Sequence, residues 1–201
     1  MLYIGLTAKP VWDTQSHSNR WEWISNVENN WETIRDEALA VVNNPGHPHK
    51  TILQSVAEGG LWKSFQLVDE GQWREETVAL CPKTTQIMQG VPLLTGCSLG
   101  YCYISSIAPQ TVITSHYGVS NVKLRCHLPL VLPNTNDLGM KIGSEGVRWE
   151  LGKCLVFDDS YLHNVWHLGD PEDGPRIVLL FDIWHPDLTT SEIEAVKYVL
   201  N

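Results

Sequence analysis

Two histidines and an arginine, each beside a strand-like apolar run, are the residues whose types and order could do chemistry. His116 and His163 lie far apart in the sequence. Two neutral imidazoles brought together from different strands can hold a divalent metal ion. Arg176 opens the apolar run 177–181, and its guanidinium fork could bind the carboxylate of a small dicarboxylic acid. The sequence therefore predicts a metal site next to an anion site.

The composition limits the class of protein. The chain has 201 residues, of which 43% are hydrophobic and 18% charged, as in one soluble globular domain. A net charge of -9 disfavours a nucleic-acid partner, which needs an excess of Lys and Arg. No apolar run is long enough for a membrane span, and the opening segment does not continue as a signal peptide. We expect a cytoplasmic protein, and the sequence does not indicate its oligomeric state.

The five cysteines are odd in number and include no CxxC pair. This pattern disfavours a disulfide framework or a structural zinc site and favours reduced thiols.

Helical periodicity is confined to both ends and one short segment, whereas the second half has strand patterns. Helices are predicted over 30–42, with Asn29 or Asn30 as cap, over 84–89 and over 191–200, with Thr190 or Ser191 as cap. Strands are predicted over 97–108, 123–132, 147–151, 154–157 and 177–184. We expect one domain, 1–201, with a helical or irregular part at 1–60 and a mainly β, jelly-roll core at 96–187.

Three blocks, 105–130, 152–166 and 176–186, resemble the aspartyl/asparaginyl β-hydroxylases, with the last block ending Asp182-Ile183-Trp184-His185-Pro186. The resemblance extends from about residue 62 to residue 187. It implies a double-stranded β-helix, the cupin-like jelly roll, with flanking N-terminal and C-terminal helices. It also implies an oxygenase that uses Fe(II), 2-oxoglutarate and dioxygen.

The same resemblance identifies His116 and His163 as the two iron ligands. In most of the wider oxygenase class a carboxylate stands two residues after the first histidine, but here that position is Gly118. The resembled family also has glycine there, with water completing the coordination. The pair Asp158-Asp159 is expected to form a structural turn.

Contacts to 2-oxoglutarate are implied for six residues: Trp62, Ser105, Arg125, Cys126, His127 and Arg176. Arg176 and Ser105 would hold the distal carboxylate, and His127 would approach the chelating end. Arg125 is counted with the two histidines as catalytic. Because strand residues alternate, Arg125 and His127 should share a face and Cys126 should point away, as a small buried hydrophobe would. A packing role is the alternative for Trp62.

Four further histidines, His47, His49, His167 and His185, are expected to be structural or exposed. The spacing between His163 and Arg176 is longer than in the family. The extra residues fall in the turn-rich segment 169–175, where an insertion is tolerated.

The implied activity is hydroxylation of an unactivated carbon of an amino acid, free or in a peptide, with release of succinate and carbon dioxide. Gly118 keeps a second outcome open, because an iron position without a carboxylate could hold chloride. Halogenation, desaturation or ring closure on a small molecule would then follow. A third alternative is a β-barrel binding module without catalysis.

Overall fold

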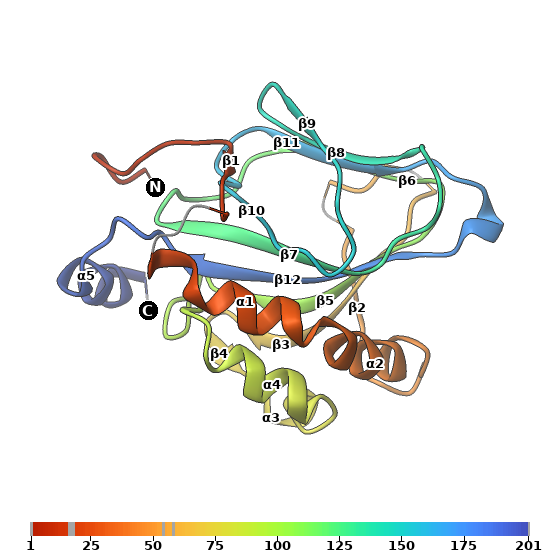
Figure 1. Ribbon diagram of the computed structural model, residues 1–201, viewed down its shortest axis with the longest axis horizontal. Helices are drawn as coiled ribbons and strands as arrows, with labels where there is room; N and C mark the ends of the chain where they lie inside the picture. Colours follow the sequence, from red (N-terminus) through yellow and green to blue (C-terminus); the bar gives the residue numbers. More distant parts are fainter. Residues whose placement is uncertain (1, 16–18, 54, 58, 201) are drawn as a thin grey trace.

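Two antiparallel β-sheets face each other in this computed structural model, which describes residues 2–15, 19–53, 55–57 and 59–200 (Figure 1). The larger sheet has the order β1-β10-β7-β12-β5-β3-β2, with β4 paired to β3, and the smaller sheet has the order β6-β11-β8-β9. The larger sheet contains β1 (Val11–Trp12), β2 (Lys50–Thr51), β3 (Trp62–Asp69), β4 (Gln72–Trp73), β5 (Cys102–Ile107), β7 (Lys123–Val131), β10 (Leu155–Phe157) and β12 (Arg176–Trp184). The smaller contains β6 (Thr111–His116), β8 (Leu138–Ile142), β9 (Glu145–Val147) and β11 (His163–His167). This is the predicted double-stranded β-helix.

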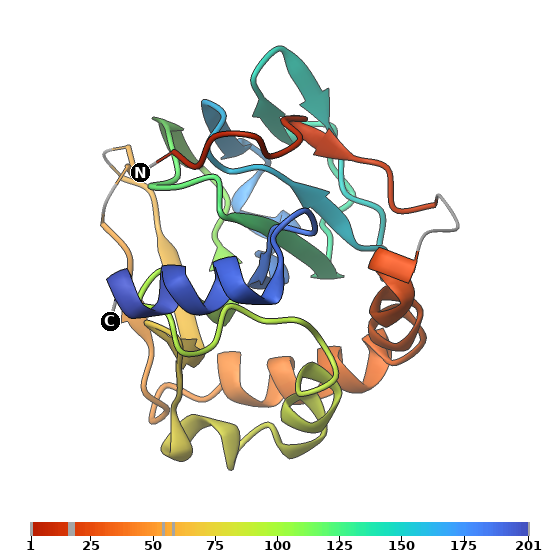
Figure 2. The same cartoon turned by 90° about the vertical axis from the view of Figure 1, so that its left-hand side faces the viewer.

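Helices cover the face of the larger sheet that points away from the smaller one (Figure 1). They are α1 (Glu22–Asn29), α2 (Trp31–Val42), α3 (Glu75–Val78) and α4 (Pro82–Met88), with short 3-10 turns at Asn19–Trp21 and Pro171–Asp173. The C-terminal helix α5 (Thr190–Leu200) lies across one end of the sandwich (Figure 2). No helix in the described part of the chain is long and apolar enough to cross a membrane.

Strict alternation along the central strands separates a core from a cavity. On β7, Leu124, Cys126 and Leu128 are buried in the main hydrophobic cluster together with residues of α1 and α2. Lys123 and Arg125, which alternate with these core residues along the strand, line the cavity on the opposite face. Successive strand side chains point to opposite faces, so one strand contributes both to the core and to the candidate site.

The three predicted helices are confirmed as α2, α4 and α5, but their caps differ. Asn30 precedes α2 without a side-chain capping bond. At α5 the cap is Thr189, whose hydroxyl accepts a hydrogen bond from the Glu192 N–H while the Glu192 carboxylate accepts one from Thr189. This reciprocal arrangement is a capping box.

The predicted boundaries of the β core are too narrow. Strands β1 and β3 lie before residue 96 and belong to the larger sheet. The predicted strand 147–151 is wrong beyond Val147, where β9 ends. Glu150 accepts a turn hydrogen bond from Lys153 instead of pairing with a neighbouring strand.

Candidate functional site

The two predicted metal ligands lie side by side at the mouth of the sandwich. His116 ends β6 and His163 begins β11, and the two residues face each other as partners in the antiparallel pair. Their ring centroids are 4.2 Å apart, as expected for directly opposed strand residues. The described residues include no group of three His, Cys, Asp or Glu side chains placed to hold a metal ion. That these two histidines hold a metal ion stays a prediction.

Backbone contacts fix both rings in the same tautomer. Nδ1 of His116 lies 2.8 Å from the Thr114 carbonyl oxygen, and Nδ1 of His163 lies 2.9 Å from that of Tyr161. A carbonyl oxygen only accepts, so each Nδ1 carries the proton and each neutral ring keeps its lone pair on Nε2. Burial lowers the pKa of His163 to about 4, so this ring is neutral and can bind a metal ion at physiological pH.

Gly118 stands where a carboxylate ligand would otherwise stand, and the structure shows why a side chain does not fit. A Cβ at this position would lie closer than 3.0 Å to the carboxylate carbon and both carboxylate oxygens of Asp159. The Gly118 N–H also donates to the Asp159 carbonyl oxygen at 2.6 Å. Asp159 thus occupies the space beside the first histidine, and its Oδ1 is buried without a hydrogen-bond partner among the described residues.

Asp159 belongs to a buried four-residue ion cluster, formed with Lys123, Arg125 and Asp182. Lys123 Nζ donates to Asp159 Oδ2 at 2.7 Å and to Asp182 Oδ1 at 2.9 Å. Arg125 binds Asp182 through two hydrogen bonds of 2.9 and 3.1 Å. Burial alone would raise the pKa of Asp159, but Lys123 and Arg125 outweigh it and lower that pKa to about 2. The expectation of a mere turn role holds for Asp158, whose Oδ1 accepts from the Ser160 N–H, and is wrong for Asp159.

An inner pocket, lined by His116 and His163 at one side, extends to Arg176 and His127. Arg176 is 1% exposed, and its Nε and Nη1 atoms have no partner among the described residues. Burial without a carboxylate lowers the pKa of Arg176 to about 9. His127 accepts a hydrogen bond on Nδ1 from the Trp149 indole at 3.2 Å, and its buried Nε2 lacks a partner. These unpaired N–H donors at a buried cation fit an anionic ligand.

The remaining predicted cosubstrate residues divide into two groups. Trp62, Ser105 and Arg125 line the inner pocket. The Trp62 indole donates to the Ser105 hydroxyl at 3.0 Å. Cys126 is fully buried in the core on the helix side of β7. Its side chain therefore does not join the pocket, and the expected contact of Cys126 with the cosubstrate is withdrawn because strand alternation points it away.

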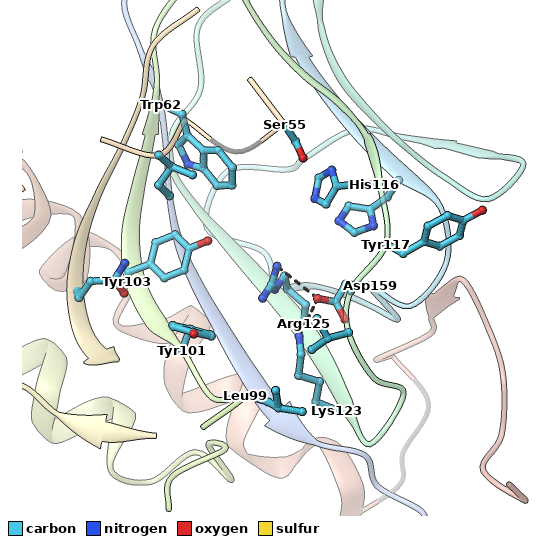
Figure 3. A pocket seen from close by; sticks show the side chains of 15 residues that line it. Ser55, Trp62, Leu99, Tyr101, Tyr103, His116, Tyr117, Lys123, Arg125 and Asp159 are labelled. Atoms are coloured by element: carbon cyan, nitrogen blue, oxygen red, sulfur yellow. Dashed lines mark hydrogen bonds and ion pairs between the residues drawn. The ribbon is translucent and has the colours of Figure 1, made fainter. Parts of the chain in front are cut away.

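The outer cavity above the two histidines is open to solvent and has a volume of about 380 Å³. Figure 3 shows His116, Trp62, Tyr103, Arg125 and Asp159 around it. It shares its Trp62, His116, Arg125 and His163 walls with the inner pocket. A ligand bound in the inner pocket would therefore meet the metal position and the outer cavity at one junction.

Sequence reasoning missed several residues of the site. Lys123 continues the alternation of Arg125 and His127 by one more step, so the strand pattern could have identified it. Trp149 lies outside any strand, and its Arg176 contact, 4.8 Å from guanidinium carbon to ring centroid, has no signal in the sequence. The four histidines predicted to be structural or exposed, His47, His49, His167 and His185, have structural contacts. For example, His185 Nε2 lies 3.1 Å from the Thr7 carbonyl oxygen, and His167 Nε2 lies 2.8 Å from that of Gly174.

Comparisons with known proteins identify relatives of this chain. Residues 28–186 match the family model described as aspartyl/asparaginyl beta-hydroxylase. The chain is 35% identical over 191 residues to human aspartate beta-hydroxylase domain-containing protein 2, covering 93% of this chain and 50% of that protein. It is 36% identical over 195 residues to human aspartyl/asparaginyl beta-hydroxylase, covering 97% of this chain and 25% of that protein. The chain thus spans half or less of these curated relatives.

Among solved structures, a 2OG-Fe(II) oxygenase family oxidoreductase from Burkholderia pseudomallei matches with a TM-score of 0.50 and 11% identity, covering 72% of this chain and 77% of that one. This likeness concerns the fold, which is the same jelly-roll sandwich. The extent of the sequence matches establishes more: the chain is a member of the aspartyl/asparaginyl beta-hydroxylase family.

Proposed function

We propose that this chain is a 2-oxoglutarate- and Fe(II)-dependent dioxygenase that hydroxylates an unactivated carbon of an amino acid, free or within a peptide. The observation that carries the proposal is the junction between the His116–His163 pair, with both Nε2 atoms free to bind a metal ion, and the pocket that ends at the unpaired Arg176. A dicarboxylic cosubstrate has the two ends that such a site requires.

His116 and His163 would hold the iron, and Arg176 would hold the distal carboxylate of 2-oxoglutarate. When bound, iron and 2-oxoglutarate supply the activation of dioxygen. His127 is neutral at physiological pH, because burial and the nearby Arg176 lower its pKa well below its usual value. With Nδ1 occupied by Trp149, its proton resides on Nε2 and can be donated to the bound cosubstrate.

Cosubstrate binding requires side chains to move. The free volume of the inner pocket is about 20 Å³, roughly the space of one water molecule. Trp62 is half-buried and forms part of the wall of both the inner pocket and the outer cavity. A rotation of its side chain would enlarge the inner pocket. We therefore expect Trp62 to turn from the Ser105 hydroxyl, which is then free to bind the distal carboxylate beside Arg176.

The structure disfavours chloride at the position opened by Gly118. The Asp159 carboxylate, with its unpaired Oδ1, already stands beside Gly118, and a second anion there would be repelled. Hydroxylation is accordingly the proposed outcome. The mass of the product distinguishes it: hydroxylation adds one oxygen atom, halogenation replaces one hydrogen atom with a halogen atom, and desaturation or ring closure removes two hydrogen atoms.

Substrate-dependent formation of succinate tests the proposal. Wild-type protein should form succinate with Fe(II), 2-oxoglutarate and a pool of amino acids and peptides, and His116→Ala should not. Arg176→Met should raise the KM for 2-oxoglutarate. Arg35→Met, at a half-buried arginine on α2 that lines neither pocket, should leave it unchanged. Equal turnover by wild type and His116→Ala would refute the assignment. The absence of a visible absorption band on anaerobic mixing with iron and 2-oxoglutarate would favour the binding-module alternative.

A further inference from the structure

Trp149 contacts both residues that would hold the two ends of the cosubstrate, although it lines neither cavity. Its indole N–H donates to Nδ1 of His127 at 3.2 Å. The guanidinium of Arg176 lies over the face of its ring, with 4.8 Å between the guanidinium carbon and the ring centroid. Trp149 is 9% exposed and is not among the described residues that line the inner pocket or the outer cavity. It can therefore act on a bound ligand only through these two neighbours.

The two contacts hold Arg176 and His127 without using the groups that would bind a ligand. A cation over an aromatic ring is attracted to the ring face, so the N–H donors in the guanidinium plane stay free. Nε and Nη1 of Arg176 have no partner among the described residues. On His127 the indole fills the acceptor Nδ1, while the buried Nε2 has no partner in the same part of the chain. A carboxylate in place of the Trp149 ring would instead pair with the guanidinium and use up its donors.

The backbone joins Trp149 to the strand that carries His127. Trp149 lies in the segment between β9 and β10, and three residues later the Gly152 N–H donates to the Pro129 carbonyl oxygen at 3.0 Å. Pro129 lies on β7, two residues after His127. The Trp149 ring also packs in the buried cluster that contains Phe157. The indole and the imidazole are thus held in one rigid arrangement before any ligand binds.

We propose that Trp149 is a positioning residue for the cosubstrate, which holds the donors of Arg176 and His127 ready for 2-oxoglutarate, an inference that rests on the proposed function. Without the indole N–H, Nδ1 of His127 is free to take the proton, and Nε2 would then present a lone pair to the ligand carboxylate. Without the ring, Arg176 loses the face that holds its guanidinium and must be ordered when the ligand binds. Both losses weaken 2-oxoglutarate binding.

The test is anaerobic calorimetric titration of the Fe(II)-loaded full chain with 2-oxoglutarate. Trp149→Phe keeps an aromatic ring but removes the N–H, and it should raise the Kd about three- to tenfold. Trp149→Leu removes both contacts and should raise the Kd about tenfold further. The control is Trp73→Phe, at a tryptophan of β4 that packs on the main core and lines neither cavity. It should leave the Kd within about twofold of wild type.

Two further readouts separate positioning from a general loss of stability. In the His127→Leu background, Trp149→Phe should change the Kd by less than about twofold, because the indole N–H acts through the imidazole. Trp149→Phe should also shift the visible absorption band that forms with iron and 2-oxoglutarate, since His127 is assigned to the chelating end. Arg176→Met acts at the distal carboxylate and should weaken binding without shifting the band.

Thermal unfolding shows whether each variant is folded at the assay temperature. If Trp149→Phe is unfolded, magnetic resonance of wild type with isotope-labelled indoles replaces it. The indole signal displaced by His127→Leu should then also be displaced by 2-oxoglutarate with Zn(II) in place of iron.

The possible failures are distinguishable. Equal Kd values for wild type and Trp149→Phe, additive losses in the double variant, or an indole signal that 2-oxoglutarate leaves in place would refute the positioning role of Trp149 while the proposed cofactor site stands. If wild type itself binds no 2-oxoglutarate, the proposed function fails and this inference fails with it.

Discussion

Replacing Gly118 with alanine tests whether Asp159 excludes a side chain beside the first histidine. The added Cβ would collide with a carboxylate that cannot easily turn away, since Lys123 binds it at 2.7 Å. Gly118 does not have a positive φ, so the cost is steric. Overpacking of this kind costs about 1–3 kcal/mol.

A loss of about 2 kcal/mol corresponds to a fall in Tm of about 4–8 °C for a domain of this size. The assay is thermal unfolding of Gly118→Ala beside Gly146→Ala. Gly146 is the matched control, because a Cβ there meets nothing within 4 Å. Gly146→Ala should unfold within about 1–2 °C of wild type. Equal Tm values for the two variants would show that Asp159 moves aside freely.

Gly118→Asp extends the same reasoning to the metal site. In the wider oxygenase class a carboxylate at this position would be a third ligand, so the simple expectation is tighter iron binding. Here the new carboxylate would be placed against Asp159, and two close carboxylates repel. We therefore expect Gly118→Asp to be less stable than Gly118→Ala and to bind iron no more tightly than wild type. Iron titration that gave a clearly lower Kd for Gly118→Asp would refute this argument.

Three further perturbations test the charges of the site. Arg176→Met should raise the free energy of unfolding of the ligand-free protein by about 1–2 kcal/mol, because it removes a buried unpaired cation. The measurement is unfolding in urea, and a lower free energy of unfolding for Arg176→Met than for wild type would contradict this expectation. Asp182→Asn should cost about 3–5 kcal/mol in the same assay, because it leaves Arg125 without its two-pronged partner. Asp36→Asn, at a surface ion pair with Arg35 in which the Asp36 side chain is 67% exposed, should cost under about 1 kcal/mol. The pKa of Asp159 is about 2 in the folded protein, against 3.8 for the free group. The ionised carboxylate therefore stabilises the fold by on the order of 2 kcal/mol above pH 4, and this stabilisation is lost as the pH falls towards 2. A difference in stability between wild type and Asp159→Asn that stays constant over this range would contradict the assignment.

The sequence allowed the prediction of long, regularly alternating or apolar strands and of the two histidines. β7 and β12 each have nine residues, and their patterns are unambiguous. β8 and β9 are short, and two glycines, a lysine and a glutamate interrupt the apolar residues among their eight positions, so local propensity gave little signal for them. They form strands because β8 pairs with the edge of β11 that is not paired with β6, and β9 pairs with β8.

The ion cluster could not be predicted for a different reason. Asp182 lies in the middle of a strand that is otherwise apolar, where a carboxylate gives no indication of its partner. Its partner Arg125 lies 57 residues earlier in the sequence and meets it through the register of β12 with β7. Only the alignment of these two strands identifies the pair.

The division of β7 into two alternating sets limits how the gene can change. Deleting or inserting one codon within the strand would exchange the two sets, so that Arg125 and His127 would enter the apolar layer and Cys126 would face water. Such a one-residue shift of register cannot be repaired by a single compensating substitution. Homologous chains should therefore vary in length at the turn 169–175 and keep the length of β7 constant.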